Sequence, residues 1–167
     1  MMKEHTIKQL NRENIEDLML LEKKCFSESL AEGKESFLHA AEIYPKGSVL
    51  LYIEDKIAGA LFFHPYFEGK VQKIKSTGVT LTGQENCMYL HSFSIHPDFR
   101  GKGLTQILFD HFNNVSLEEG YKIQALMAVQ GSERFWMRYG FESVRQLVYG
   151  DALSTYMIRK TDRNLKI

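Results

Sequence analysis

Short stretches of the chain alternate apolar with polar residues, and this alternation predicts β-strands. Successive side chains of a strand point to opposite faces of the sheet, so alternation allows one face to be buried. Two further runs, 48–53 and 56–63, are rich in β-favouring apolar residues, are joined at Glu54 and Asp55, and predict a hairpin. The polar, turn-rich segment 67–86 is expected to be a connection with irregular or edge structure. The other predicted strands cover 5–10, 87–95, 122–129, 141–150 and 154–160.

Other stretches repeat apolar residues at spacings of three and four, which is typical of a helix that packs one face on a core. In 11–26 this face contains Glu22 as its only misfit, and Asn11 or Asn14 is the predicted N-cap. The apolar members of the face are Ile15, Leu18, Met19, Cys25 and Phe26. A second helix is predicted over 35–44, before Pro45.

A third helix is predicted to begin at residue 104, with Gly120 as its C-cap. Its core-facing stripe consists of Leu104, Ile107, Leu108, Phe112 and Val115. A short fourth helix over 132–139 starts at Ser132 and ends before Gly140. The order of the elements, β-α-α-β-β-β-α-β-α-β-β, predicts a mixed α/β (α+β) domain.

The loop 100–105, with the sequence RGKGLT, has the composition of an anion-binding site. Glycines let main-chain N–H groups approach a ligand, and the start of a helix leaves such groups unpaired. Arg100 and Lys102 add positive charge, so the loop predicts a cradle for a phosphate or diphosphate. A plain turn with solvated charges explains the glycines as well. The spacing matches neither a Walker A loop nor the Gly-x-Gly-x-x-Gly dinucleotide fingerprint.

The length and composition limit the functional classes. The 167 residues suit one domain over 1–167 with a substantial core. A formal net charge of zero argues against nucleic-acid and anionic-membrane partners, which call for a basic excess. No signal-peptide core and no apolar run of the ~20 residues of a membrane span is visible. The isolated Cys25 and Cys87 are typical of a reduced cytoplasmic protein, and no metal-ligand spacing is present.

The loop and its surroundings resemble the GNAT superfamily of acetyl-CoA-dependent N-acetyltransferases. The acetyl-CoA motif of that family, Gln/Arg-x-x-Gly-x-Gly/Ala between a strand and a helix, is matched at Arg100 and Gly103, with Thr105 at its last position. The stretches SIHPDFRGKGLTQIL and RFWMRYGFE fit the family pattern in order and separation. A looser likeness, to arylalkylamine N-acetyltransferases, lies in LHSFSIHPDFRGKG, in the hairpin and in the helix with Glu22 and Phe26.

The resemblance implies the GNAT fold, whose mostly antiparallel sheet splays between its fourth and fifth strands and is flanked by helices. The pantetheine arm of acetyl-CoA is then expected in the gap, beside main-chain groups of Phe93 and Ile95. The diphosphate is expected on the N–H groups of 101–105. The residues expected to bind acetyl-CoA are Phe93, Ser94, Ile95, Arg100, Gly101, Lys102, Gly103, Leu104, Thr105, Ser132 and Trp136. Ser132 is equally a plain helix cap.

The implied reaction is direct attack of a neutral amine on the thioester in a ternary complex. Alkyl amines are mostly protonated at neutral pH, so a base is needed. His91 matches the second histidine of the His-Leu-His strand of arylalkylamine N-acetyltransferases and is the candidate catalytic base, with a structural strand histidine as the alternative. Trp136 stands where the family has a tyrosine acid. Tyr139 is the candidate substitute, with helix packing or unaided departure of the thiolate as alternatives.

We therefore expect an acyltransferase (EC 2.3.1.-) that acetylates a primary amine, a small molecule, without a metal. Two alternatives stay open. An acyl-CoA sensor without turnover is favoured by the departures at Thr105, Val129 and Trp136, and a protein or peptide N-acetyltransferase needs an open acceptor cleft. A homodimer is compatible with the resemblance, since family members are often dimers. Candidate walls of the acceptor pocket are Phe26, Phe37, Tyr44 and residues 64–67, which are expected to leave the third strand.

Overall fold

The computed structural model describes residues 4–161; residues 1–3 and 162–167, which the predicted single domain includes, lie outside the described part. The strands are β1 (His5–Gln9), β2 (Ser48–Ile53), β3 (Lys56–Tyr66), β4 (Cys87–Ile95), β5 (Ile123–Ala128), β6 (Glu142–Tyr149) and β7 (Ala152–Lys160). The helices are α1 (Ile15–Cys25), α2 (Lys34–Ile43), α3 (Leu104–Glu118) and α4 (Glu133–Arg138), with 3₁₀ turns η1 (Pro45–Gly47) and η2 (Pro97–Phe99). The predicted order of elements and the mixed α/β class are confirmed.

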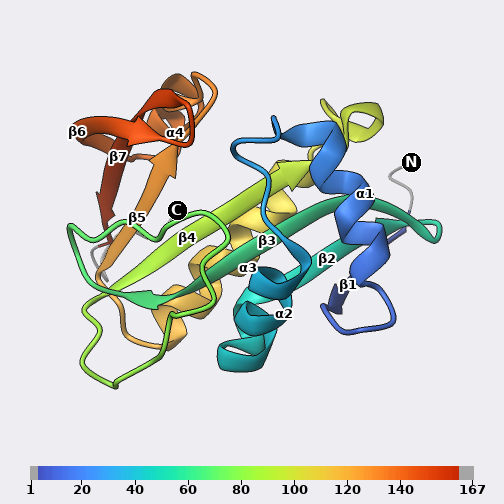
Figure 1. The fold of residues 1–167 in the computed structure, drawn as a ribbon, viewed down its shortest axis with the longest axis horizontal. Helices are drawn as coiled ribbons and strands as arrows, with labels where there is room; N and C mark the ends of the chain where they lie inside the picture. Colours follow the sequence, from blue (N-terminus) through green and yellow to red (C-terminus); the bar gives the residue numbers. More distant parts are fainter. Residues whose placement is uncertain (1–3, 162–167) are drawn as a thin grey trace.

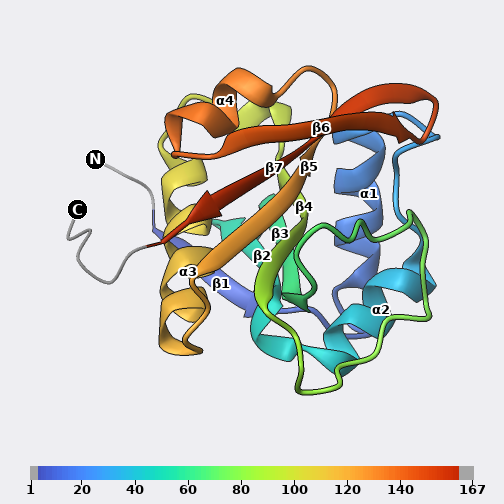
Figure 2. The same ribbon diagram turned by 90° about the vertical axis from the view of Figure 1, so that its left-hand side faces the viewer.

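The strands form one seven-stranded sheet in the order β1-β2-β3-β4-β5-β7-β6 (Figure 1). Every neighbouring pair is antiparallel except β4 and β5, which run parallel. Helices cover both faces, with α1 and α2 on one side and α3 on the other (Figure 2). None of the helices within 4–161 is long and apolar enough to cross a membrane.

Alternation along β2 divides its side chains between the two helical layers. Leu50 and Tyr52 join a core cluster that also contains Leu18 and Leu21 of α1. Leu51, which points the opposite way, joins the cluster of α3 side chains on the other face. Both faces of β2 are therefore buried under helices, which is why its residues form a nearly continuous apolar run.

β4 and β5 pair only at their beginnings. The last pair in register is Leu90 with Leu126, although β4 continues to Ile95 and β5 to Ala128. Beyond that pair the two strands diverge, and β5 turns away together with β6 and β7 (Figure 1). The predicted splay of the sheet between its fourth and fifth strands is confirmed.

β3 is longer than the sequence pattern predicts. His64, Pro65 and Tyr66 remain in the strand and pair with β4, whereas they were expected to leave it. Pairing of β3 with β2 ends at Phe62, so beyond this residue β3 has a neighbour on one side only. A proline, which has no N–H to donate, can stand where the other side is unpaired.

Helix ends differ from the predicted ones by a residue or two. Asn14 is the N-cap of α1, but its side chain caps no helical N–H and accepts the N–H of Asn11 instead. At the end of α3 the C-cap is Glu119, and Gly120 follows with a φ of 83°. Glycine is favoured there because a left-handed residue commonly follows a helix.

Candidate active site

A cavity of about 520 Å³ occupies the gap between β4 and β5. β4 contributes one wall, and the end of β5 together with α4 contributes the opposite one. The loop between α1 and α2 closes a further side with Phe26, Leu30 and Glu32. The cavity therefore exists because two parallel strands stop pairing and their unpaired edges are covered by other elements.

Six of the predicted cofactor residues line this cavity. They are Phe93, Ile95, Arg100, Thr105, Ser132 and Trp136. Trp136 is 6% exposed, and its indole meets the ring of Phe93 edge-on with centroids 5.4 Å apart. These two rings form an apolar wall beside the gap, as expected for the channel of a pantetheine arm.

Two residues of β4 direct their main-chain N–H and C=O groups toward the gap. His96 N–H donates to Ala58 O of β3 over 2.8 Å, and hydrogen-bonded residues alternate in an antiparallel ladder. Ser94 therefore also directs its main chain to β3, whereas Phe93 and Ile95 direct theirs to the gap. Ser94 does not line the cavity, so we do not retain it as a cofactor contact. The Ile95 carbonyl already accepts Arg100 Nε–H over 3.1 Å.

The start of α3 forms the other end of the site. Gly101 and Gly103 have φ values of 75° and 80°, and a Cβ on either would meet no atom within 4 Å. In the part of the chain that the structure describes, the N–H groups of 101–105 have no main-chain acceptor. Lys102 is exposed beside them, and Leu104 buries its side chain in the core. Unpaired donors, space and positive charge together fit a diphosphate.

Tyr139 does not face this cavity. Its ring packs on Phe109 with centroids 4.3 Å apart, and it lines a separate cavity between α3 and α4. Burial, with the charge of Asp110, raises the pKa of Tyr139 above its usual value. The structure thus supports the packing interpretation, and we do not retain Tyr139 as a catalytic acid.

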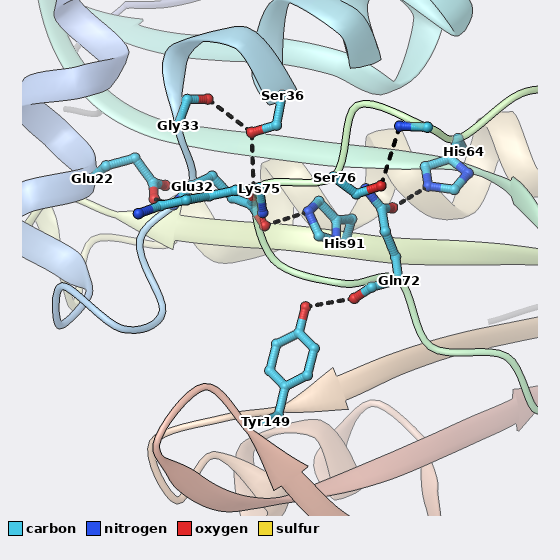
Figure 3. Close-up of polar contacts among 11 residues, drawn as sticks. Glu22, Glu32, Gly33, Ser36, His64, Gln72, Lys75, Ser76, His91 and Tyr149 are labelled. Atoms are coloured by element: carbon cyan, nitrogen blue, oxygen red, sulfur yellow. Dashed lines mark hydrogen bonds and ion pairs between the residues drawn. The ribbon is translucent and has the colours of Figure 1, made fainter.

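His91 and Glu32 meet in the cavity wall. His91 Nε2 lies 2.8 Å from Glu32 Oε1, and both side chains are 6% exposed (Figure 3). The approach is an ion-pair contact, not an aligned hydrogen bond, and His91 Nδ1 has no partner within the described residues. A carboxylate can only accept, so a neutral His91 carries its proton on Nε2 and its lone pair on Nδ1.

Two further groups fix Glu32. Its Oε2 accepts the Lys75 main-chain N–H over 2.6 Å and the Ser36 hydroxyl over 2.9 Å (Figure 3). Burial by itself would raise the pKa of Glu32. The neighbouring His91 ring, the Lys75 N–H and the Ser36 hydroxyl outweigh burial and lower that pKa below its usual value. Glu32 is therefore an anion at neutral pH, and both of its oxygens are engaged.

The side of the cavity near Glu32 is roofed by contacts between distant segments. The Tyr149 hydroxyl of β6 donates to Gln72 O of the 67–86 connection over 2.8 Å (Figure 3). Next to it, a Cβ on Gly150 would meet Leu30 Cδ2 at 2.9 Å and Ser29 O at 3.0 Å. The turn after β6 thus lies directly against the loop after α1, and both close the chamber.

Other candidate walls of the acceptor pocket lie elsewhere. Phe37 is buried against Phe62 in the core under α1 and α2, and Tyr44 packs on Phe63. His64 is 3% exposed and bonds through Nε2 to Gln72 Oε1 over 2.5 Å. Of the residues suggested for this wall, Phe26 lines the cavity.

The cavity is also lined by Glu32, Tyr149 and Leu30, which were not predicted from the sequence. Glu32 and Leu30 lie in a polar segment without a motif, and Tyr149 lies at the end of an edge strand. Their roles depend on contacts between segments far apart in the chain, which no local pattern reports. Within residues 4–161, no three His, Cys, Asp or Glu side chains come together as a set of metal ligands.

The splayed, mostly antiparallel sheet with helices on both faces is the GNAT fold. The chain belongs to the Acetyltransferase (GNAT) family, whose sequence model matches residues 15–141. No curated protein matches the chain by sequence.

Solved structures share the fold at low sequence identity. The loading GNATL domain of CurA from Lyngbya majuscula is similar with a TM-score of 0.81 and 16% identity, over 94% of this chain and 98% of that one. Arabidopsis thaliana Naa50, in complex with the bisubstrate analogue CoA-Ac-MVNAL, has a TM-score of 0.71 and 15% identity, over 93% and 98%. The ribosomal-protein-S18-alanine N-acetyltransferase from Escherichia coli is similar with a TM-score of 0.64 and 13% identity, over 98% of this chain and 100% of that one.

Proposed function

We propose that the protein is a cytoplasmic N-acetyltransferase that transfers the acetyl group of acetyl-CoA to a small primary amine in a ternary complex. One observation carries the proposal: a single cavity joins the start of α3 to the His91–Glu32 pair. Acyl-CoA use is supported by two similar structures, Naa50 with a CoA bisubstrate analogue and the GphF GNAT-like decarboxylase with isobutyryl-CoA.

Acetyl-CoA, when bound, supplies the acetyl thioester. The N–H groups of 101–105, with Arg100 and Lys102, would hold its diphosphate. The Phe93 main chain, which no strand pairs on the side of the gap, would bond to the amides of the pantetheine arm as an added strand does. Trp136 would exclude water from one side of that arm.

His91 would accept the proton of the attacking nitrogen. The reaction needs an N–H bond to break, and Nδ1 would carry the lone pair that accepts the proton. Nδ1 is buried in the structure, so the acceptor nitrogen would reach it after a small shift of the ring or of the chamber wall. The negative charge of Glu32 stabilises the imidazolium that forms and holds the ring in place.

No side chain in the cavity is well suited to protonate the leaving sulfur. The Tyr149 hydroxyl is committed to Gln72 O, and burial raises its pKa further above the usual value. A thiol has a reference pKa of about 8.5, so its thiolate leaves without a proton donor at moderate cost.

The roof over the chamber favours a small acceptor over a protein. A peptide would need an open path past Glu32, and the contacts of Tyr149 with Gln72 and of Gly150 with Leu30 close that side. The CoA arm also takes part of the 520 Å³, which leaves room for a few non-hydrogen atoms of the acceptor beside it.

The test is release of CoA from acetyl-CoA in the presence of a panel of small amines and of peptides with free N-termini. Turnover with small amines and little with peptides would support the proposal, and preference for a peptide would favour the protein acetyltransferase. Thermal stabilisation by acetyl-CoA without turnover on any acceptor would favour the sensor.

A further inference from the structure

The ionisable side chains that line the cavity are unevenly distributed. Apart from tyrosine, they are Glu32, His91 and Arg100. Arg100 follows the end of β4, where its Nε–H donates to Ile95 O. Ile95 lies four residues beyond His91, a distance of roughly 13 Å at the rise of a strand. Arg100 therefore serves the cofactor end, and among the described residues that line the cavity the only fixed charge at the acceptor end is the negative charge of Glu32.

Glu32 cannot turn away from an incoming acceptor. Glu32 Oε1 contacts His91 Nε2, and Glu32 Oε2 accepts hydrogen bonds from the Lys75 main-chain N–H and the Ser36 hydroxyl. Lys75 contributes only its main chain to this contact, since its side chain is exposed and does not line the cavity. Glu22, whose Oε2 accepts the main-chain N–H of Glu32, is a second acidic residue next to Glu32 and brings no positive charge to it.

We propose that the acceptor is a small primary amine that enters as its ammonium ion and bears no carboxylate beside the nitrogen, an inference that rests on the proposed function. His91 can act as a base only in its neutral form, and beside the ionised Glu32 that form gives the reactive pair one net negative charge. An ammonium ion brings the total to zero. One of its protons passes to His91 Nδ1 while the nitrogen keeps the electron pair that attacks the thioester, and the second proton that the nitrogen loses on forming the amide is taken up by the CoA thiolate after it has left. An α-carboxylate would instead place a second negative charge beside Glu32.

The rest of the acceptor would lie against apolar side chains. Phe26 and Leu30 come from the loop after α1, and Leu126 and Met127 from β5, and all four line the cavity. These walls offer no hydrogen bond to a hydroxyl or carboxyl group, so polar substituents on the acceptor would lose their water without replacement. An alkyl chain of modest length suits them.

The test compares three acceptors that share one branched alkyl skeleton: 3-methylbutylamine, leucinamide and leucine. Leucinamide adds a neutral group of nearly the same size as the carboxylate, so it separates charge from bulk. We expect kcat/KM to be about tenfold or more lower for leucine than for leucinamide, with 3-methylbutylamine at least as good as leucinamide. Equal use of leucine and leucinamide would overturn the inference and leave the proposed function standing.

A pair of variants assigns the selectivity to Glu32. Glu32→Gln should narrow the ratio of leucinamide to leucine severalfold, whatever happens to absolute turnover, because a ratio cancels a general loss of activity. Glu28→Gln is the control, because it removes the same charge from the same loop, while Glu28 is exposed and does not line the cavity. The ratio of kcat/KM for leucinamide to that for leucine should be the same in this variant as in the unaltered protein. An unchanged ratio in Glu32→Gln would contradict the inference. If none of the three acceptors releases CoA from the unaltered protein, the proposed function itself is wrong.

Discussion

Glu22 Oε2 accepts the main-chain N–H of Glu32 over 3.1 Å, so a side chain from the middle of α1 anchors the residue that contacts His91. Glu22 is 1% exposed, and its Oε1 has no partner within 4–161. Burial, opposed by the hydrogen bond from Glu32 and reinforced by the charge of Glu32, raises the pKa of Glu22 to about 7. The one polar misfit on the core face of α1 is thus part of the support of the site.

The raised pKa of Glu22 predicts a pH-dependent stability. Between the ordinary value of 4.5 and about 7, the unfolded chain releases this proton and the folded chain keeps it. The free energy of unfolding therefore falls as pH rises through this window, by on the order of 3 kcal/mol from this group. Glu22→Gln keeps an acceptor for the Glu32 N–H and removes the titration.

Urea denaturation at pH 4.5 and pH 8 measures this effect. The Glu22→Gln variant should resemble the unaltered protein at pH 4.5 and be more stable than it at pH 8. A difference between the two proteins that is the same at both pH values would show that Glu22 does not titrate in this range.

Gly103→Glu should abolish acetyl-CoA binding. The substitution places a negative charge and bulk at the N-cap of α3, where the unpaired N–H groups are expected to hold the diphosphate. Gly120→Glu is the matched control, since Gly120 has a φ of 83°, no atom within 4 Å of an added Cβ, and a position at the far end of α3. Calorimetry should show binding lost in the first variant and kept in the second. Unchanged affinity in Gly103→Glu would exclude the cradle.

His91→Ala should lower kcat by about 100-fold or more, because it removes the base that accepts the amine proton. The dissociation constant of acetyl-CoA should stay within about twofold, since His91 lies away from the start of α3. Steady-state kinetics and calorimetry on one preparation separate the two quantities. Normal turnover in this variant would leave His91 as a structural histidine.

Tyr149→Phe should relax the limit on acceptor size. It removes the hydrogen bond to Gln72 O, a contribution of about 1 kcal/mol, and so loosens the roof. The kcat/KM of a bulky amine relative to that of a small one should rise severalfold. Tyr156→Phe is the control, because the Tyr156 hydroxyl also binds the 67–86 connection, at Gly69 N–H over 2.8 Å, but lies outside the cavity. If the ratio of kcat/KM for the bulky amine to that for the small amine is the same in both variants, the Tyr149 hydrogen bond does not limit acceptor size.

The sequence predicted the elements that rest on periodicity. The strand 87–95 and the helix from residue 104 were found where the structure has them, because both patterns reflect burial of one face. The length of β3 was missed because Pro65 normally argues against a strand, and only the early end of β2 makes it acceptable.

The candidate site was predictable at the cofactor end and not at the acceptor end. Glycines and charges before a helix have a local meaning, so the 100–105 loop could be recognised. Glu32 contacts His91 and Lys75, and Tyr149 contacts Gln72, across large separations in sequence. Side-chain contacts of that kind follow from the packing of whole elements, which a single sequence does not report.

The central claim is that CoA lies in the gap between β4 and β5 with its diphosphate on the start of α3. Titration of the ¹⁵N-labelled protein with acetyl-CoA, followed by amide NMR, tests it most directly. The account predicts large shifts for the amides of Gly101 to Thr105 and of Phe93, with small shifts in β1 and β2. Binding that leaves those amides unmoved, or that shifts residues outside the gap, would contradict the account.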